Sequence, residues 1–400
     1  MKKYVWLIDK YFVPEPLTSK NRYKIFFDLS NIEVTIFHSN IGEYNQKLDK
    51  SNYEDVQPFY KNVKWEKVPS LSFSKKILYF SFSINLFFSC IFRKRPEIII
   101  ASCPDPFQAF AGLILAKIKK AKYIVDFRDY WPELLVENHQ IKSGHFLDRF
   151  FFFITKQLAK HSDAIMCVNL EESKQYLKKR GVLQKRIFER KNIYIDLNEF
   201  ESSKRLQGKN YLEAVRFYNI SKKESKHILL FTGRLNVGKE HSEYIIKLLN
   251  NFSNKISLVV LSSDKNMFNI LKKTNELQLL YLYELPRKEY LSILHLVDCL
   301  VTFITDIGYD FSSNKIMDAL ALGTPVIVGN FRKEKRDIGL PGVFSFNIKD
   351  YKSFEDAIKD AVNLKKDSKS IEYMKQFSLD LYKRQVDSLN KFLENLDKVN

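Results

Sequence analysis

Several features are scarce or missing in this 400-residue chain, and each absence narrows its class. The four cysteines are scattered, with no CxxC pair and no histidine at metal-ligand spacing, which argues against a disulfide framework and a zinc site. Only a short apolar run precedes Asp9, which predicts a first strand and no signal peptide. The chain also lacks low-complexity tracts and internal repeats, so we expect a globular, intracellular protein.

The chain is too long for one ordinary core and suits two α/β domains. Its formal net charge is +18, with an excess that leans toward the N-terminal half. Such a surplus favours anionic partners, although a lysine-rich host composition explains it equally well. No nucleic-acid reader motif accompanies the basic residues, so we do not expect nucleic acid as a partner.

Apolar runs alternate with amphipathic stretches in both halves of the chain. Strands are predicted at residues 4–9, 33–38, 98–102, 123–127, 164–169, 227–232, 256–261, 279–283, 298–304 and 325–329. The alternation with helices predicts an α/β fold of parallel sheets covered on both faces. It is interrupted over residues 201–227, so we predict an N-terminal domain at 1–205, a second domain at 206–375 and a C-terminal helix at 376–400.

The most informative segment carries two carboxylates eight residues apart, Asp310 and Asp318. Asp310 follows a predicted strand, and Asp318 lies near the start of the next predicted helix. Ligands bind at this edge of an open α/β sheet, where carboxylates accept hydrogen bonds from sugar hydroxyls and a polar turn offers backbone N–H groups to phosphate. We therefore predict half of a sugar-nucleotide site, whose turn consists of Phe311, Ser312, Ser313, Asn314 and Lys315. A helix-capping role for Asp318 is the simpler alternative.

A second polar segment follows the predicted strand at residues 227–232. Gly233 permits a sharp turn, and Arg234 and Lys239 can neutralise a diphosphate together with the positive end of the next helix. The alternative is a loop with two solvated cations.

These two segments, with Leu285-Pro286-Arg287 between them, resemble the C-terminal domain of GT-B glycosyltransferases. They are most similar to the large retaining family that carries a Glu-x7-Glu motif. The resemblance implies that Arg234 and Lys239 bind the donor diphosphate, Asp310 the donor sugar and Asp318 the nucleotide ribose. This chain has Asp at both Glu positions, so each side chain is one methylene shorter.

The N-terminal half is similar to transferases that build lipid-linked surface polysaccharides. The similarity rests on residues 101–107 and 125–133, where Arg128 stands at a position that holds His in many relatives. It implies that Arg128 and Asp129 are catalytic. Acceptor-side or loop residues would then be Thr18, Ser19 and Asp105, although the loop around Thr18 lacks the glycines usual there.

The resemblance implies two Rossmann-like, doubly wound domains facing a central cleft, with the C-terminal helix packing back toward the N-terminal domain. It implies transfer of a hexosyl or acetamidohexosyl group from a UDP- or GDP-linked donor to a lipid-linked saccharide, with retention, in capsule, O-antigen or exopolysaccharide synthesis. No cofactor and no metal are expected, since Arg234 and Lys239 supply the charge. A nucleotide-sugar 2-epimerase and a non-catalytic nucleotide-sugar or lipid-binding protein are the alternatives.

Residues 77–92 are mostly apolar and are bracketed by Lys75, Lys76, Arg93, Lys94 and Arg95. Sixteen residues fall short of the ~20 that a membrane span needs. They fit either an interfacial helix on anionic lipid or a buried helix before the strand at residue 98. The aromatic run at 150–154 supports membrane contact, so we expect a cytoplasmic protein, peripheral on the inner face of the cell membrane. A basic stretch at 174–191 either extends the positive face or forms a solvated helix surface, and we favour the solvated surface.

Overall fold

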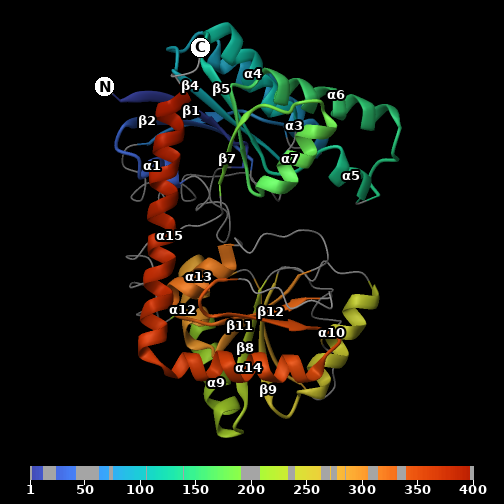
Figure 1. The fold of residues 1–400 in the computed structure, drawn as a ribbon, viewed down its shortest axis with the longest axis vertical. Helices are drawn as coiled ribbons and strands as arrows, with labels where there is room; N and C mark the ends of the chain where they lie inside the picture. Colours follow the sequence, from blue (N-terminus) through green and yellow to red (C-terminus); the bar gives the residue numbers. More distant parts are fainter. Residues whose placement is uncertain are drawn as a thin grey trace. The chain divides into compact units, whose positions relative to one another are not determined.

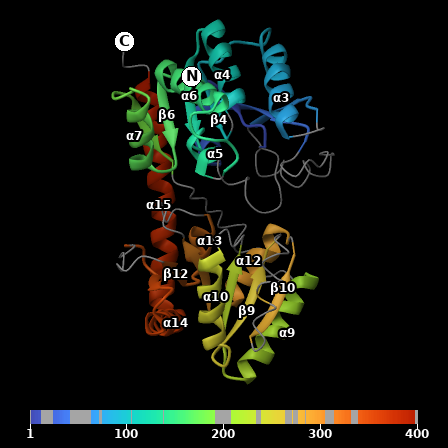
Figure 2. The same cartoon turned by 90° about the vertical axis from the view of Figure 1, so that its right-hand side faces the viewer.

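The chain folds into two compact units, seen in Figures 1 and 2. Unit 1 comprises Met1–Asn192 and Arg384–Asn400, and unit 2 comprises Ile193–Lys383. The computed structural model describes residues 2–11, 24–41, 63–71, 75–104, 106–137, 139–190, 208–232, 239–262, 271, 277–283, 285–304, 314–330 and 339–396.

Unit 1 contains a parallel sheet in the order β3-β2-β1-β4-β5-β6-β7. Its strands are β1 (Lys3–Ile8), β2 (Ile32–Ser39), β3 (Val63–Val68), β4 (Ile98–Cys103), β5 (Lys122–Phe127), β6 (Ala164–Cys167) and β7 (Arg186–Glu189). Successive residues of a strand point to opposite faces, and both faces are covered here, so β4 is wholly buried and apolar at every position except Ser102.

The helices of unit 1 are α1 (Lys24–Phe27), α3 (Lys75–Cys90), α4 (Pro106–Lys119), α5 (Glu133–Glu137), α6 (Phe146–His161) and α7 (Leu170–Lys179). Buried residues of α3, α4, α6 and α7 share one core with alternate residues of β1 and β4, such as Trp6 and Ile99. The opposite face, with Val5 and Ile98, packs against α1 and the end of α15.

Unit 2 contains a second parallel sheet in the order β10-β9-β8-β11-β12-β13. Its strands are β8 (His227–Thr232), β9 (Ile256–Leu261), β10 (Gln278–Leu282), β11 (Cys299–Ile304), β12 (Val326–Asn330) and β13 (Val343–Asn347). The helices are α9 (Lys209–Lys223), α10 (Lys239–Asn251), α12 (Arg287–Leu296), α13 (Asn314–Leu322), α14 (Tyr351–Lys366) and the first part of α15 (Ser368–Asn395). Residues of α10 and α14 cover one face of this sheet.

Helix α15 begins in unit 2 and ends in unit 1. Leu389 and Leu393 are fully buried against β1 and α1. Lys3 Nζ donates to the Leu393 carbonyl oxygen (3.0 Å), and Asn31 Nδ2 donates to Asn390 Oδ1 (2.7 Å). The prediction that the C-terminal helix packs back onto the N-terminal domain is therefore confirmed.

The end of α13 is a glycine-dependent turn. The Thr324 N–H donates to the Ala319 carbonyl (2.8 Å), and the Gly323 N–H donates to the Leu320 carbonyl (3.0 Å), a Schellman motif. Gly323 has φ +72°, and a Cβ added there would lie 2.4 Å from Ile371 Cγ2 of α15. The predicted helix stop is thus also a close contact between α13 and α15.

We expect Gly323→Ala to lower the free energy of unfolding by about 2–4 kcal/mol, from backbone strain and overpacking together. Gly181 offers a matched control, since it has φ +69° with nothing within 4 Å of the added Cβ. Gly181→Ala should cost only the backbone strain, about 1 kcal/mol. Denaturant unfolding measures both variants, and equal losses would contradict the proposed Ile371 clash.

Candidate functional site

The strand order of unit 2 reverses between β8 and β11, which are paired in register from Cys299↔Leu229 to Val301↔Phe231. Because the strands are parallel, their carboxyl ends lie at one edge of the sheet, the usual place for a ligand. Residues 233–238 follow β8, and residues 305–313 follow β11. The strands that precede the two sequence-predicted motifs are thus neighbours at the switch point, while residues 233–238 and 305–313 themselves lie outside the described residues.

Lys315 connects the start of α13 to the end of β8. It lies in the first turn of α13, and its Nζ donates to the carbonyl oxygen of Thr232, the last residue of β8 (2.8 Å). Desolvation by burial lowers the pKa of Lys315 to about 8. Lys315 therefore holds the start of α13 against the end of β8.

Asp318 forms a buried, bidentate ion pair with Arg287 at the start of α12. Arg287 Nη1 and Nη2 donate to the two carboxylate oxygens at 3.0 and 2.8 Å, and both residues are at most 5% exposed. Burial raises the pKa of Asp318, while the positive charge of Arg287 opposes that rise. Each oxygen keeps further acceptor capacity, so the ribose contact stays a prediction.

Tyr290, one turn further along α12, is buried near this pair. Within the described part of the chain its hydroxyl has no hydrogen-bond partner. Burial raises the pKa of Tyr290 well above its usual value, and the negative charge of Asp318 adds to the rise. Arg287 and Tyr290 were missed as site residues, because nothing in the sequence indicates that α12 packs beside α13.

In unit 1 the strand order reverses between β1 and β4. Asp9, directly after β1, is 2% exposed, and Arg128, directly after β5, places Nη1 3.2 Å from Asp9 Oδ2. The same nitrogen donates to Ser102 Oγ in β4 (3.4 Å). The structure thus brings the predicted catalytic Arg128 to the switch point, together with an acid that sequence reasoning overlooked.

Asp129 lies next in this loop and is half-buried; its carbonyl accepts from the Trp131 N–H (3.2 Å). Helix α7 anchors the loop. Tyr130 Oη and Ser173 Oγ are 2.6 Å apart, and the Tyr176 hydroxyl donates to the Trp131 carbonyl (2.7 Å). The position of Asp129 therefore depends on α7.

Arg180, directly after α7, completes this anchor. Its side chain is fully buried and donates to both carboxylate oxygens of Glu133 (2.9 Å each) and to the Trp131 carbonyl (2.8 Å). Its guanidinium also lies 3.3 Å from the centre of the Tyr176 ring. The interpretation of residues 174–191 as a solvated surface is wrong here and at Arg190, which pairs with Asp126 in the core at 2.9 Å.

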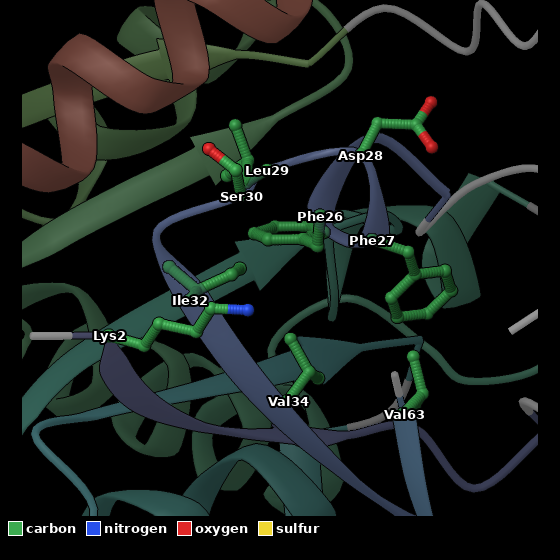
Figure 3. A pocket seen from close by; sticks show the side chains of 9 residues that line it. All are labelled: Lys2, Phe26, Phe27, Asp28, Leu29, Ser30, Ile32, Val34 and Val63. Atoms are coloured by element: carbon green, nitrogen blue, oxygen red, sulfur yellow. The ribbon is translucent and has the colours of Figure 1, made fainter. Parts of the chain in front are cut away.

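A pocket in unit 1 lies at the opposite edge of the sheet, where β1, β2 and β3 begin (Figure 3). It is lined by Lys2, Phe26, Phe27, Asp28, Leu29, Ser30, Ile32, Val34 and Val63. The predicted polar motifs all follow the carboxyl ends of strands, so this pocket does not belong to the candidate site.

No family model matches the sequence, and no curated protein matches it. Solved structures do match: a glycosyltransferase from Rickettsia africae is 11% identical with a TM-score of 0.62, covering 100% of both chains. Anabaena HepE in complex with UDP-glucose is 9% identical with a TM-score of 0.60, covering 99% of this chain and 100% of its own. A Listeria monocytogenes protein provisionally assigned as a UDP-N-acetylglucosamine 2-epimerase is 13% identical with a TM-score of 0.53, covering 99% and 98%. This chain has the GT-B fold.

Only part of the predicted site falls on described residues of the GT-B chain. Lys315 and Asp318 lie on α13, which follows β11, and Arg128 and Asp129 directly follow β5. Lys239 and Asn314 begin α10 and α13, but their side chains are outside the described set. Also outside it are Gly233, Arg234, Asp310, Phe311, Ser312, Ser313, Thr18, Ser19 and Asp105.

The apolar segment at 77–92 forms α3 and its end in the GT-B chain. Leu78, Phe82 and Leu86 are fully buried, as the buried-helix alternative predicts, while other positions are exposed. Arg93 pairs with Glu66 (2.6 Å), and Lys94 Nζ lies 5.6 Å from the centre of the Tyr4 ring. Arg95 donates to the Lys120 carbonyl (2.6 Å), whereas the side chains of Lys75 and Lys76 are not among those described. None of the described helices is long and apolar enough to cross a bilayer.

Proposed function

We propose that this chain is a glycosyltransferase that moves a sugar from a nucleotide-sugar donor to a hydroxyl of a lipid-linked saccharide. The observation that supports the proposal is the pairing of β8 with β11 at the switch point, where Lys315 joins the start of α13 to the end of β8. The GT-B fold supports it, because HepE was solved with UDP-glucose.

On the donor side, Arg234 and Lys239 would neutralise the diphosphate leaving group, and Asp310 would accept hydrogen bonds from the donor sugar. Asp318 would bind the ribose hydroxyls with the oxygen lone pairs that Arg287 leaves free. Arg287 is a positioning residue in this scheme, because its planar fork fixes the orientation of the carboxylate. We propose a UDP- or GDP-linked hexose or acetamidohexose as the donor, without a metal.

On the acceptor side, Asp129 would orient the attacking hydroxyl and Arg128 would hold an anionic group of the acceptor. Asp9 restrains Arg128 from the side of β1. We propose retention of anomeric configuration and a role in surface-polysaccharide synthesis, on the strength of the sequence resemblance.

Arg234→Ala is expected to weaken nucleotide-sugar binding about 10- to 150-fold, since a charge-assisted hydrogen bond is worth about 1.5–3 kcal/mol. Isothermal titration with the UDP- or GDP-sugar that most raises the melting temperature of the wild type measures the effect. Arg216→Ala, at an exposed position of α9, is the control and should bind normally. Wild-type affinity in Arg234→Ala would refute the donor-site assignment.

A 2-epimerase is the second candidate, because the Listeria protein shares the fold. Incubating the enzyme with UDP-sugars in the absence of any acceptor separates the two, since an epimerase converts the donor sugar by itself. Formation of an epimer would overturn the transferase proposal. Donor binding without turnover on any acceptor would instead favour the non-catalytic alternative.

A further inference from the structure

Helix α3 presents a stripe of large apolar side chains to solvent. Ile77, Phe80, Ile84 and Phe88 recur every three or four residues and therefore share one side of the helix; Phe88 is 66% exposed. The stripe continues beyond the helix end to Phe92, which is 94% exposed. A different side of α3 supplies its core residues, so folding of unit 1 does not require these exposed side chains to be apolar.

The two neighbouring helices extend the stripe. Helix α4 packs between α3 and α6 and exposes Ile114 and Ile118, one turn apart. Helix α6 exposes Phe146 (72%), Phe153 (57%) and, between them, Phe150. Figures 1 and 2 show the three helices side by side on the same side of the sheet.

Aromatic rings connect the stripes. The Phe107 ring of α4 has its centre 6.3 Å from that of Phe80 in α3 and 6.5 Å from that of Phe150 in α6, and Phe150 stacks on Phe146. These ring contacts thus run across all three helices. We call the surface formed by the exposed apolar residues of α3, α4 and α6, together with Phe92, the α3–α4–α6 face. A contiguous exposed apolar patch of this kind marks an interaction site.

The charge around this face is one-sided. Residues 75–95, 106–120 and 145–161 contain eleven lysines and arginines but one carboxylate, Asp148, which accepts from the Gly144 N–H at the start of α6 (2.6 Å). The exposed cations beside the apolar stripes include Lys117, Lys120, Arg149, Lys156 and Lys160. A dimer formed through this face would place the cations of one copy next to those of the other, which like-charge repulsion opposes.

We propose that the α3–α4–α6 face docks the protein on a membrane surface that contains anionic phospholipid. The apolar side chains would enter the boundary between headgroups and acyl chains, and the flanking cations would bind phosphate groups. The proposal concerns unit 1 alone and does not depend on the proposed transferase activity.

The test is co-sedimentation of the full chain with vesicles of phosphatidylcholine, with or without phosphatidylglycerol. The wild type should bind the anionic vesicles more tightly than the neutral ones, and added salt should weaken that binding. The triple variant Phe80→Ser/Phe88→Ser/Phe153→Ser should partition at least about tenfold less, because three inserted aromatic side chains are lost. The matched control Leu183→Ser/Leu212→Ser/Ile220→Ser removes exposed apolar side chains elsewhere and should bind as the wild type does.

A second variant, Lys117→Glu/Lys156→Glu, leaves the apolar stripes intact and should also lower anionic-vesicle binding about tenfold or more. Absence of wild-type binding, equal binding to neutral vesicles, or wild-type binding by both variants would overturn the proposal. So would a wild-type dimer in sedimentation that the triple variant converts to monomer, because the face would then serve self-association. Nucleotide-sugar affinity, measured in the same samples, reports separately on the proposed function.

Discussion

Replacing Arg287 with alanine should lower the free energy of unfolding by about 3–5 kcal/mol, because the Asp318 carboxylate would stay buried without its partner. Both oxygens of Asp318 accept from Arg287, and the pair is almost wholly buried, so little solvent is present to replace the lost bonds. Nucleotide-sugar affinity should fall in the same variant, since the orientation of Asp318 would no longer be fixed. Denaturant unfolding and calorimetric titration measure the two effects.

Lys288→Ala, at the exposed position beside Arg287, is the control and should change stability by no more than about 0.5 kcal/mol. The double variant Arg287→Met/Asp318→Leu should recover most of the lost stability, because an apolar pair of similar volume replaces the ion pair. It should not recover donor affinity. If Arg287→Ala were as stable as the wild type, the ion pair would contribute nothing to stability in solution.

Arg180→Ala should reduce the rate of sugar transfer about 100-fold, because a misplacement near 1 Å in a catalytic loop costs that much. Arg180 holds Trp131 and Glu133, only two and four residues beyond Asp129, yet it touches neither Arg128 nor Asp129 in any described contact. It is a positioning residue, so the loss should appear in kcat. Donor affinity should be unchanged, since the donor motifs lie in unit 2.

Lys179→Ala is the neighbouring exposed control and should transfer at the wild-type rate. Arg180→Lys keeps the charge but cannot reproduce the bidentate contact with Glu133, so its kcat should lie between those of the wild type and Arg180→Ala. Thermal unfolding must accompany the assay, with rates measured well below the melting temperature of each variant. A kcat that stays at the wild-type value in Arg180→Ala would contradict the anchoring role.

The central strands could be predicted from the sequence, as could the edge strand β10, whereas three other edge strands could not. β4 begins with the apolar run Ile98–Ala101 because both of its faces are covered. By contrast, β3, β7 and β13 lie at sheet edges and are mostly half-buried, so their residues are mixed and carry no clear strand signal. Local sequence pattern thus predicts most readily the strands that are buried on both faces.

Some residues of the candidate site could likewise be predicted from the sequence, and others could not. Lys315 and Asp318 were predictable because their motif is local and follows a strand. Arg287 pairs with Asp318, 31 positions along the chain, and Arg180 pairs with Glu133, 47 positions away. The packing of α12 on α13 and of α7 on the loop brings these partners together, and the local sequence does not indicate either contact. Asp9 had a usable signal, a charged residue that directly follows an apolar strand at the switch point.

Helix α15 has a consequence for the order in which the protein matures. Leu389, Leu393 and Leu396 cover the side of the first sheet that carries Val5 and Leu7, so a core begun by the first strand is closed by nearly the last residues of the chain. During synthesis the ribosome must therefore complete unit 2 before unit 1 can bury that side. A fragment that stops at residue 192 would leave that side of the sheet uncovered, so we expect unit 1 to be less stable without the end of α15.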